Sequence, residues 1–157
     1  MRKSTKLAAV WTVAASVLLA GGISGYAQDK MAAVKARQDF MKAQGADAKA
    51  IVDYSKGQGD KEKALAAAND LAARAGKITD LFVAGTSSDD MKDSKAKPEI
   101  WKEWDKVKMI PEAMHAEEVK LIEVIKTGDA KDVGAAWGAV GKAGCGNCHN
   151  NYRVKAS

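Results

Sequence analysis

Several residue types are scarce in this chain of 157 residues, and the scarcity of cysteine excludes one class of fold. There are only two cysteines, two histidines and two prolines. Two cysteines cannot form the multi-disulfide framework of a small secreted scaffold. The chain also lacks strand-like alternation of β-branched residues, while its apolar residues recur at helical spacing. These absences favour an all-α fold.

The N-terminus has the three-part layout of a secretory signal peptide. A basic patch precedes the uncharged run LAAVWTVAASVLLAGGI, and small residues precede a plausible cleavage point after Ala27. We therefore expect residues 1–27 to be a signal peptide, residues 28–157 to form one mature domain, and the protein to be exported to a bacterial periplasm. An uncleaved membrane anchor is the alternative, because the apolar run approaches the length that spans a bilayer. The pair Gly21-Gly22 argues against an anchor.

The positive charge of the chain belongs mainly to this N-terminal patch. The 25 Lys and Arg residues exceed the 20 Asp and Glu residues by five. Cleavage would remove three basic residues and leave a net charge of about +2. Such a small excess does not indicate a nucleic-acid partner.

Four segments of the mature chain have helical periodicity. The first extends from about residue 30 to 56, and the second follows Asp60, a good N-cap, and continues to Phe82. The polar residues 83–97 have no periodicity and predict a long loop. The third segment begins at Pro98, and the fourth begins at Asp129 and extends to about residue 152. Four amphipathic helices joined in this way predict an up-down-up-down four-helix bundle.

Two features weaken these predicted helices. Pro111 interrupts the third segment, so we expect a kink or break between Met109 and Pro111. The fourth segment contains five glycines, each of which costs up to about 1 kcal/mol of helix propensity relative to alanine. Those glycines are Gly134, Gly138, Gly141, Gly144 and Gly146. An interaction other than propensity must stabilise that helix.

The two cysteines lie together near the C-terminus in the motif C-G-N-C-H, formed by Cys145, Cys148 and His149. On a helix, these three side chains project from neighbouring positions of one face, one turn apart. Two thiols at this spacing can add across the vinyl groups of a haem, and the imidazole can reach the iron, so the motif indicates c-type haem attachment. Burial of a flat haem against the segment would also explain its small residues.

Two other kinds of site use similar motifs. A redox C-x-x-C pair generally lies at a strand-to-helix junction, and this chain has no predicted strand. A structural zinc site needs four ligands, and only the distant His115 could be added to Cys145, Cys148 and His149. Both alternatives fit the sequence less well than haem attachment.

The sequence resembles the class II c-type cytochromes, which include cytochrome c prime and its low-spin, methionine-ligated relatives. The resemblance rests on CGNCHNNYR, KPEIWKEW and RQDFMK and extends over essentially the whole mature chain, although Pro111 is not a feature of the family's third helix. It implies a four-helix bundle with one haem bound near the C-terminal helix. It also implies the following roles: thioethers at Cys145 and Cys148, proximal iron ligation by His149, haem propionates near Arg37, an exposed histidine edge near Arg153, and a distal position at Met41.

The function that the resemblance implies depends on Met41. If the thioether binds iron, the haem is six-coordinate and low-spin, which suits electron transfer. If it only packs over the iron, the haem is five-coordinate and can bind NO or CO. A methionine on an apolar stripe is more often a packing residue than a ligand. The pattern RQ-x-x-MK resembles the methionine-ligated branch, so we expect a periplasmic single-electron carrier, with the gas-binding cytochrome c prime as the alternative.

No constellation for catalysis is evident, so we expect that the protein is not an enzyme. A haem peroxidase would need a distal acid-base group, for which only His115 is available, and we expect His115 to have an ordinary surface role. The residues Trp101, Trp104 and Trp137 are expected to pack in the core or against haem. The expected partners are redox proteins, with NO or CO as alternative ligands, a second copy of the chain in a homodimer, and no nucleic acid.

Overall fold

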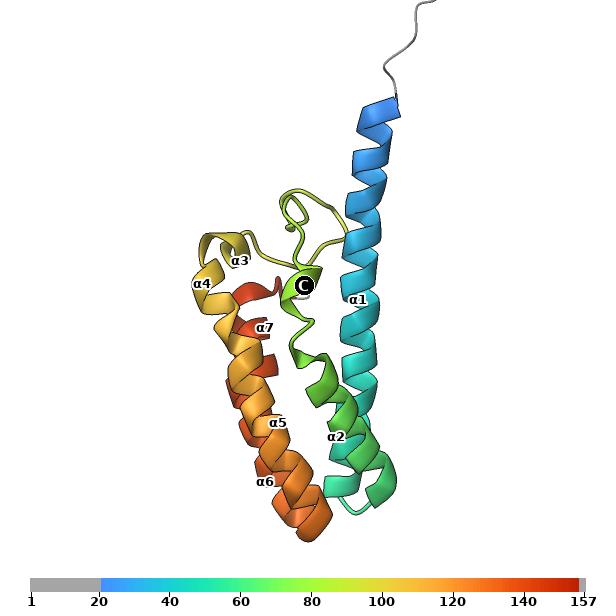
Figure 1. Ribbon diagram of the computed structural model, residues 1–157, viewed down its shortest axis with the longest axis vertical. Helices are drawn as coiled ribbons and strands as arrows, with labels where there is room; N and C mark the ends of the chain where they lie inside the picture. Colours follow the sequence, from blue (N-terminus) through green and yellow to red (C-terminus); the bar gives the residue numbers. More distant parts are fainter. Residues whose placement is uncertain (1–20, 156–157) are drawn as a thin grey trace, which may run out of the picture.

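The computed structural model describes residues 21–155, with side chains from residue 28 onward. Most of the expected signal peptide, residues 1–20, therefore lies outside the described residues. The first helix, α1 (Gly21–Ser55), extends past the other helices at its N-terminal end (Figure 1). Among the described helices, none is both long enough and apolar enough to cross a membrane.

The second helix, α2 (Lys61–Ala75), begins at the predicted N-cap. The Asp60 carboxylate accepts a hydrogen bond from the Lys63 amide at 2.9 Å. The helix ends at Ala75, so the prediction that it continues to Phe82 is wrong. Gly76 weakens continuation, and a short 3-10 helix, η1 (Thr79–Leu81), follows. The Leu81 carbonyl accepts a hydrogen bond from the side chain of Arg37, and the Phe82 carbonyl accepts one from the side chain of Trp101. These side chains take the place of the helical amides that would otherwise donate.

The third segment is broken at Lys108, one residue before the interval that its proline predicted, and also at Glu103, which was not predicted. It forms α3 (Glu99–Lys102), α4 (Trp104–Val107) and α5 (Met109–Thr127). Pro111 lies in the first turn of α5, where an amide has no intrahelical partner to lose. Pro98, which we expected at the first helical position, is instead the N-cap of α3, one residue before the helix begins. The predicted loop over residues 83–97 has no regular helix.

The fourth segment is helical throughout, but its winding changes midway. It forms α6 (Ala130–Val140), a π-helical turn η2 (Gly141–Cys145) and α7 (Gly146–Tyr152). In the π turn, the Gly146 amide donates to the Gly141 carbonyl five residues earlier. Asp129 occupies the predicted N-cap position with an extended backbone, but its side chain makes no capping hydrogen bond.

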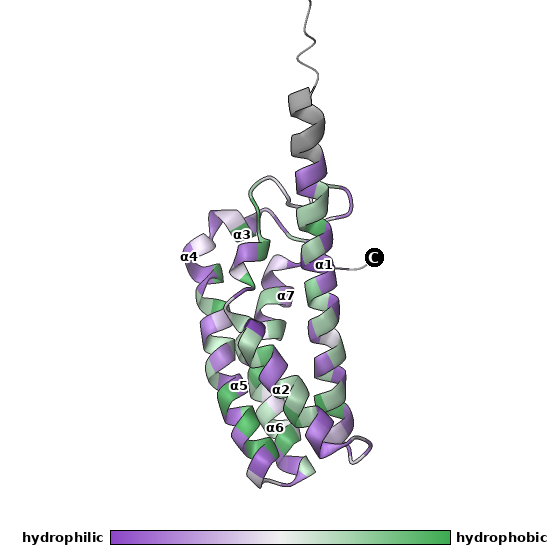
Figure 2. Ribbon diagram, turned by 45° about the vertical axis from the view of Figure 1, so that its right-hand side comes forward, coloured by the Kyte–Doolittle hydropathy of each residue, from purple (hydrophilic) through white to green (hydrophobic). Residues whose placement is uncertain are grey.

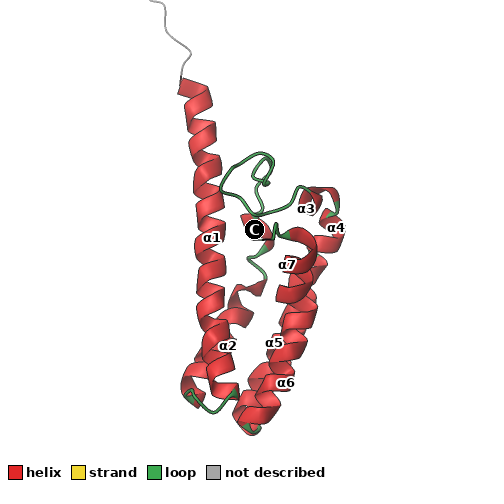
Figure 3. Cartoon of the chain, turned by 180° about the vertical axis from the view of Figure 1, so that it is seen from behind, coloured by secondary structure: helices red, strands yellow, loops and turns green. Residues whose placement is uncertain are grey.

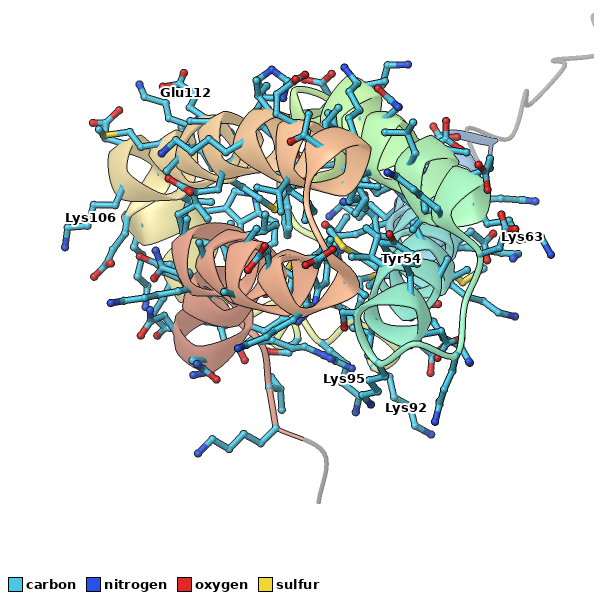
Figure 4. All side chains as sticks on the ribbon, turned by 90° about the horizontal axis from the view of Figure 1, so that it is seen from below. Tyr54, Lys63, Lys92, Lys95, Lys106 and Glu112 are labelled. Carbon is cyan, nitrogen blue, oxygen red and sulfur yellow. The ribbon has the colours of Figure 1, made fainter. Side chains whose placement is uncertain are left out.

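The four long helices pack as a closed bundle, with α1 against α2, α2 against α5, α5 against α6, and α6 against α1. The path of the chain through them (Figures 1 and 3) confirms the predicted four-helix bundle. Hydrophobic residues gather where α2, α5 and α6 meet, at the end of the bundle opposite to the N-terminal extension of α1 (Figure 2). Seen from that end (Figure 4), the labelled lysines and Glu112 point away from the interior.

The buried residues form two separate hydrophobic clusters. The main cluster lies between the long helices and includes Ile51, Leu71, Leu121 and Val140. The second cluster is smaller and contains Ala96, Ile100, Val107 and Tyr152. The space between the two clusters contains the candidate site described next.

Candidate functional site

The two cysteines connect the two hydrophobic clusters. Cys145, the last residue of the π turn, packs against the main cluster, and Cys148, on the following α7, packs against the smaller one. Both are free thiols rather than a disulfide. A group bonded to both sulfurs would therefore contact both clusters and complete a single core.

Two cavities adjoin the motif, with volumes of about 460 Å³ and 240 Å³. Five residues line both of them: Met41, Gly45, Phe82, Cys148 and His149. Met41 and Gly45 come from α1, whereas the cysteine and the histidine come from α7. These two helices approach the same region from different sides in Figure 3. The fold therefore brings the predicted proximal and distal residues to one shared space.

The protonation states of the two thiols and the imidazole suit the binding of a metal-containing porphyrin. Burial is the largest cause that raises the pKa of both the Cys145 and the Cys148 thiol, so both stay protonated near neutral pH. Desolvation lowers the pKa of His149, and the positive charge of Arg153 lowers it further. A neutral imidazole has the free nitrogen lone pair that binding to iron requires.

Arg37 is a buried cation at the edge of the larger cavity. It is only 5% exposed, and the described residues provide no carboxylate within ion-pair distance of it. Its guanidinium donates to Leu81 O, Thr86 Oγ1, Thr86 O and Ser94 Oγ at 2.9–3.1 Å, and it lies 5.1 Å from the ring centre of Phe82. Since a buried cation is costly without an anion, a haem propionate is a suitable counter-ion.

Arg153 lies just beyond α7 and is exposed. Its backbone pairs with Ala96 in an isolated antiparallel bridge, and the Tyr152 hydroxyl donates to Glu103 at 2.7 Å. The long loop is thereby joined to the end of the motif helix. Arg153 and His149 both line the larger cavity, and the positive charge of Arg153 lowers the pKa of the imidazole.

Met114 and Gly144 make a close contact beside the first cysteine. The Met114 sulfur lies 3.8 Å from the Cys145 sulfur, and Met114 lines the smaller cavity. A Cβ atom added at Gly144 would overlap the Cγ and Sδ atoms of Met114. The glycine is therefore needed for helix packing next to the attachment point.

We predict that Gly144→Ala lowers the free energy of unfolding by roughly 1–3 kcal/mol, the usual cost of overpacking. The overlap also reaches the Cβ atom of Met114, which rotation of the side chain cannot move away. Gly138→Ala is the matched control, because a Cβ there meets no atom within 4 Å and should stabilise the helix. Urea unfolding of the two haem-loaded variants measures the difference, and equal stabilities would contradict the packing argument.

The remaining predicted residues occupy mixed environments. Trp101 and Trp104 pack against the smaller cluster and Trp137 against the main one, as expected for core tryptophans. His115 is exposed and lines neither of the two cavities beside the motif, which agrees with a surface position.

Sequence reasoning missed several residues of the site. It did not identify Thr86 and Ser94 as the buried partners of Arg37, because the loop has no periodic signal. It also missed Gln44, which lines the smaller cavity and whose buried Oε1 has no hydrogen-bond partner in the described part of the chain. Gln44 follows Met41 by three residues, and this spacing places both side chains on the same face of a helix, which could have identified Gln44 as a residue near the site.

Comparison with known proteins agrees with this geometry. A family model described as "Cytochrome C'" matches residues 32–153. A cytochrome c' from Cereibacter sphaeroides is 38% identical over 77 residues, which are 49% of this chain and 50% of that protein. The chain therefore spans about half the length of this curated relative in the match.

Solved structures are similar over a longer stretch. A cytochrome c' from Rhodobacter sphaeroides has a TM-score of 0.74 and 30% identity, covering 81% of this chain and 98% of that one. A nitric oxide complex of a mutant cytochrome c prime from Alcaligenes xylosoxidans has a TM-score of 0.67 and 29% identity, covering 80% of this chain and 97% of that one.

Proposed function

Because this chain belongs to the cytochrome c' family of haem-binding c-type cytochromes, we propose that it binds a small neutral gas such as NO at the Met41 side of its haem. The main observation that supports this proposal is the smaller cavity, which adjoins Met41 and is lined mostly by apolar side chains. The Alcaligenes xylosoxidans relative solved with nitric oxide supports the same choice.

Each residue of the site has a part in this proposal. Cys145 and Cys148 would hold the haem by thioether bonds, and neutral His149 would bind the iron on one side. Arg37 would neutralise a propionate. When bound, the haem supplies the iron that takes the gas and exchanges single electrons. Met41 then limits the space on the second side, because it lines both cavities.

A second candidate function is single-electron transfer with Met41 as the sixth ligand. The observation that favours it is the position of the Met41 side chain, which shares both cavities with His149 but belongs to a different helix. A thioether that reached the iron would close the gas site and raise the redox potential.

We predict that the ferrous protein is high-spin and binds CO, and that Met41→Ala accelerates CO binding about tenfold by removing the side chain over the iron, a change in barrier of about 1.4 kcal/mol. Absorption spectra and CO flash photolysis measure spin state and rate. Met31→Ala is the control on the same helix, since Met31 is 60% exposed. A sharp low-spin α band that Met41→Ala abolishes would establish the electron carrier instead.

The remaining properties follow from the same proposal. We propose a periplasmic location from the N-terminal layout, and we propose binding and electron exchange rather than enzymatic turnover. A solved cytochrome c' with 30% identity is described as having ligand-controlled dimer dissociation, which supports a homodimer for this chain. Redox proteins are proposed as the other partners.

A further inference from the structure

Glu118 on α5 is a fully buried acid with no hydrogen-bond partner. The residue is 1% exposed, and neither of its carboxylate oxygens has a partner among the described residues. It lies four residues after Met114 and three before Leu121, both of them buried. A buried carboxylate without hydrogen bonds is costly, so an acid that remains at such a position needs an explanation.

Among the described residues, two titratable groups lie close to this carboxyl. His115, on the same helix, places Nδ1 3.8 Å from Oε2 of Glu118, beyond hydrogen-bond distance, and its side chain is 51% exposed. Cys145, on the π turn packed against α5, lies close enough for the Glu118 charge to raise the pKa of its thiol. None of the charged side chains described on α2, α4 or α6, which also pack against α5, forms an ion pair with Glu118.

The surroundings thus connect Glu118 to two places. Toward the interior, Glu118 lies one helical turn after Met114, whose sulfur is 3.8 Å from the sulfur of Cys145. Cys145 would carry the first thioether, so Glu118 lies near one edge of the haem. Toward the surface, it adjoins His115, whose side chain is half exposed to solvent. Burial raises the pKa of Glu118, and His115 opposes this rise.

We propose that Glu118 is a proton-binding site coupled to the haem, which takes up one proton when the haem gains one electron and releases it on oxidation. The electron comes from a one-electron donor, and the proton comes from water through His115 to a carboxylate oxygen of Glu118. Oxidation reverses both transfers, so charge and atoms balance. This inference depends on an attached haem but not on gas binding or on the sixth ligand.

The physical cause is the change of charge at the iron. The oxidised haem has one more positive charge, which stabilises a nearby carboxylate anion, and its loss on reduction favours the neutral acid. By linkage, the ionised acid stabilises the oxidised haem and therefore lowers the midpoint potential as the pH rises. The effect is confined to the interval between the two pKa values of Glu118, that of the oxidised protein and that of the reduced protein.

The midpoint potential of the haem-loaded protein, titrated from acid to alkaline pH, tests the proposal. The wild-type potential should fall by about 59 mV per pH unit at the steepest, the value for one proton per electron, within that interval. Glu118→Gln should remove this sloping part and keep the potential near its acid limit. Glu123→Gln, an exposed acid of the same helix, should leave the slope unchanged. A slope retained in full by Glu118→Gln, or absent from the wild type, would overturn the assignment.

A second variant avoids the burial of a new amide. His115→Ala alters an exposed residue and removes the group that lowers the pKa of Glu118, so it should move the sloping interval to higher pH. Reduced-minus-oxidised infrared spectra of the wild type should contain a protonated-carboxyl band that His115→Ala retains and Glu118→Gln lacks. No such band, or an interval unmoved by His115→Ala, would refute the proposal whatever the spin state or gas affinity of the haem.

Discussion

Replacing Cys145 and Cys148 together by alanine will yield a protein without covalently attached haem and with a disrupted C-terminal helix. Each sulfur contacts a different hydrophobic cluster, so the bound group is part of the core that joins them. Without it, the two cavities stay unfilled, and we expect the free energy of unfolding to fall by about 4 kcal/mol or more, comparable with the largest cavity-forming substitutions. Haem staining after denaturing electrophoresis and urea unfolding followed by circular dichroism measure the two effects.

The single variants Cys145→Ala and Cys148→Ala separate attachment from packing. Each retains one thiol, so each should keep its haem through denaturation while losing part of the stability that the second bond supplies. Lys142→Ala is a suitable control, because Lys142 is exposed and lies on the same π turn. Haem that stays attached in the double variant would show that another residue forms the bond.

The bundle could be predicted from sequence because its helices carry a regular signal. Asp60 and Pro111 mark local boundaries through backbone chemistry that does not depend on distant residues. The helix α2 follows Asp60 directly, and the break at Lys108 lies one residue before the predicted interval. The end of the second helix was missed because distant groups decide it. The Leu81 carbonyl accepts from Arg37 and the Phe82 carbonyl accepts from Trp101, and neither partner is near in sequence.

The candidate site was predictable to the extent that it repeats a local motif. The motif of Cys145, Cys148 and His149 follows from spacing alone, whereas the π turn that ends at Cys145 does not, because five glycines in a helix permit several windings. Glu118 was overlooked although it interrupts an apolar stripe that runs through Met114, Leu121 and Ile125. An acid on an apolar stripe indicates a buried charge, and the overall composition of the chain does not reveal it.

Arg37→Met will loosen the long loop and lower the free energy of unfolding by roughly 3 kcal/mol or more, because it leaves buried hydrogen-bond acceptors without donors. The guanidinium supplies all four of its hydrogen bonds to the stretch from Leu81 to Ser94, where Thr86 and Ser94 are almost completely buried. Amide hydrogen exchange should become faster over residues 83–97. Lys35→Met, an exposed position of the same helix, should change stability by less than about 0.5 kcal/mol.

Arg37→Lys distinguishes the charge of this residue from its geometry. Lysine keeps a positive charge for a propionate but cannot reproduce the planar fork that reaches two hydroxyls and two carbonyls at once. If Arg37 mainly orders the loop, Arg37→Lys should resemble Arg37→Met in hydrogen exchange. If it mainly neutralises the haem, Arg37→Lys should preserve the wild-type midpoint potential, while Arg37→Met lowers it, because loss of a nearby cation favours the oxidised haem. We expect both effects together, since Arg37 is buried in the loop and lines the larger cavity. Wild-type values for exchange and potential in both variants would show that Arg37 has neither role.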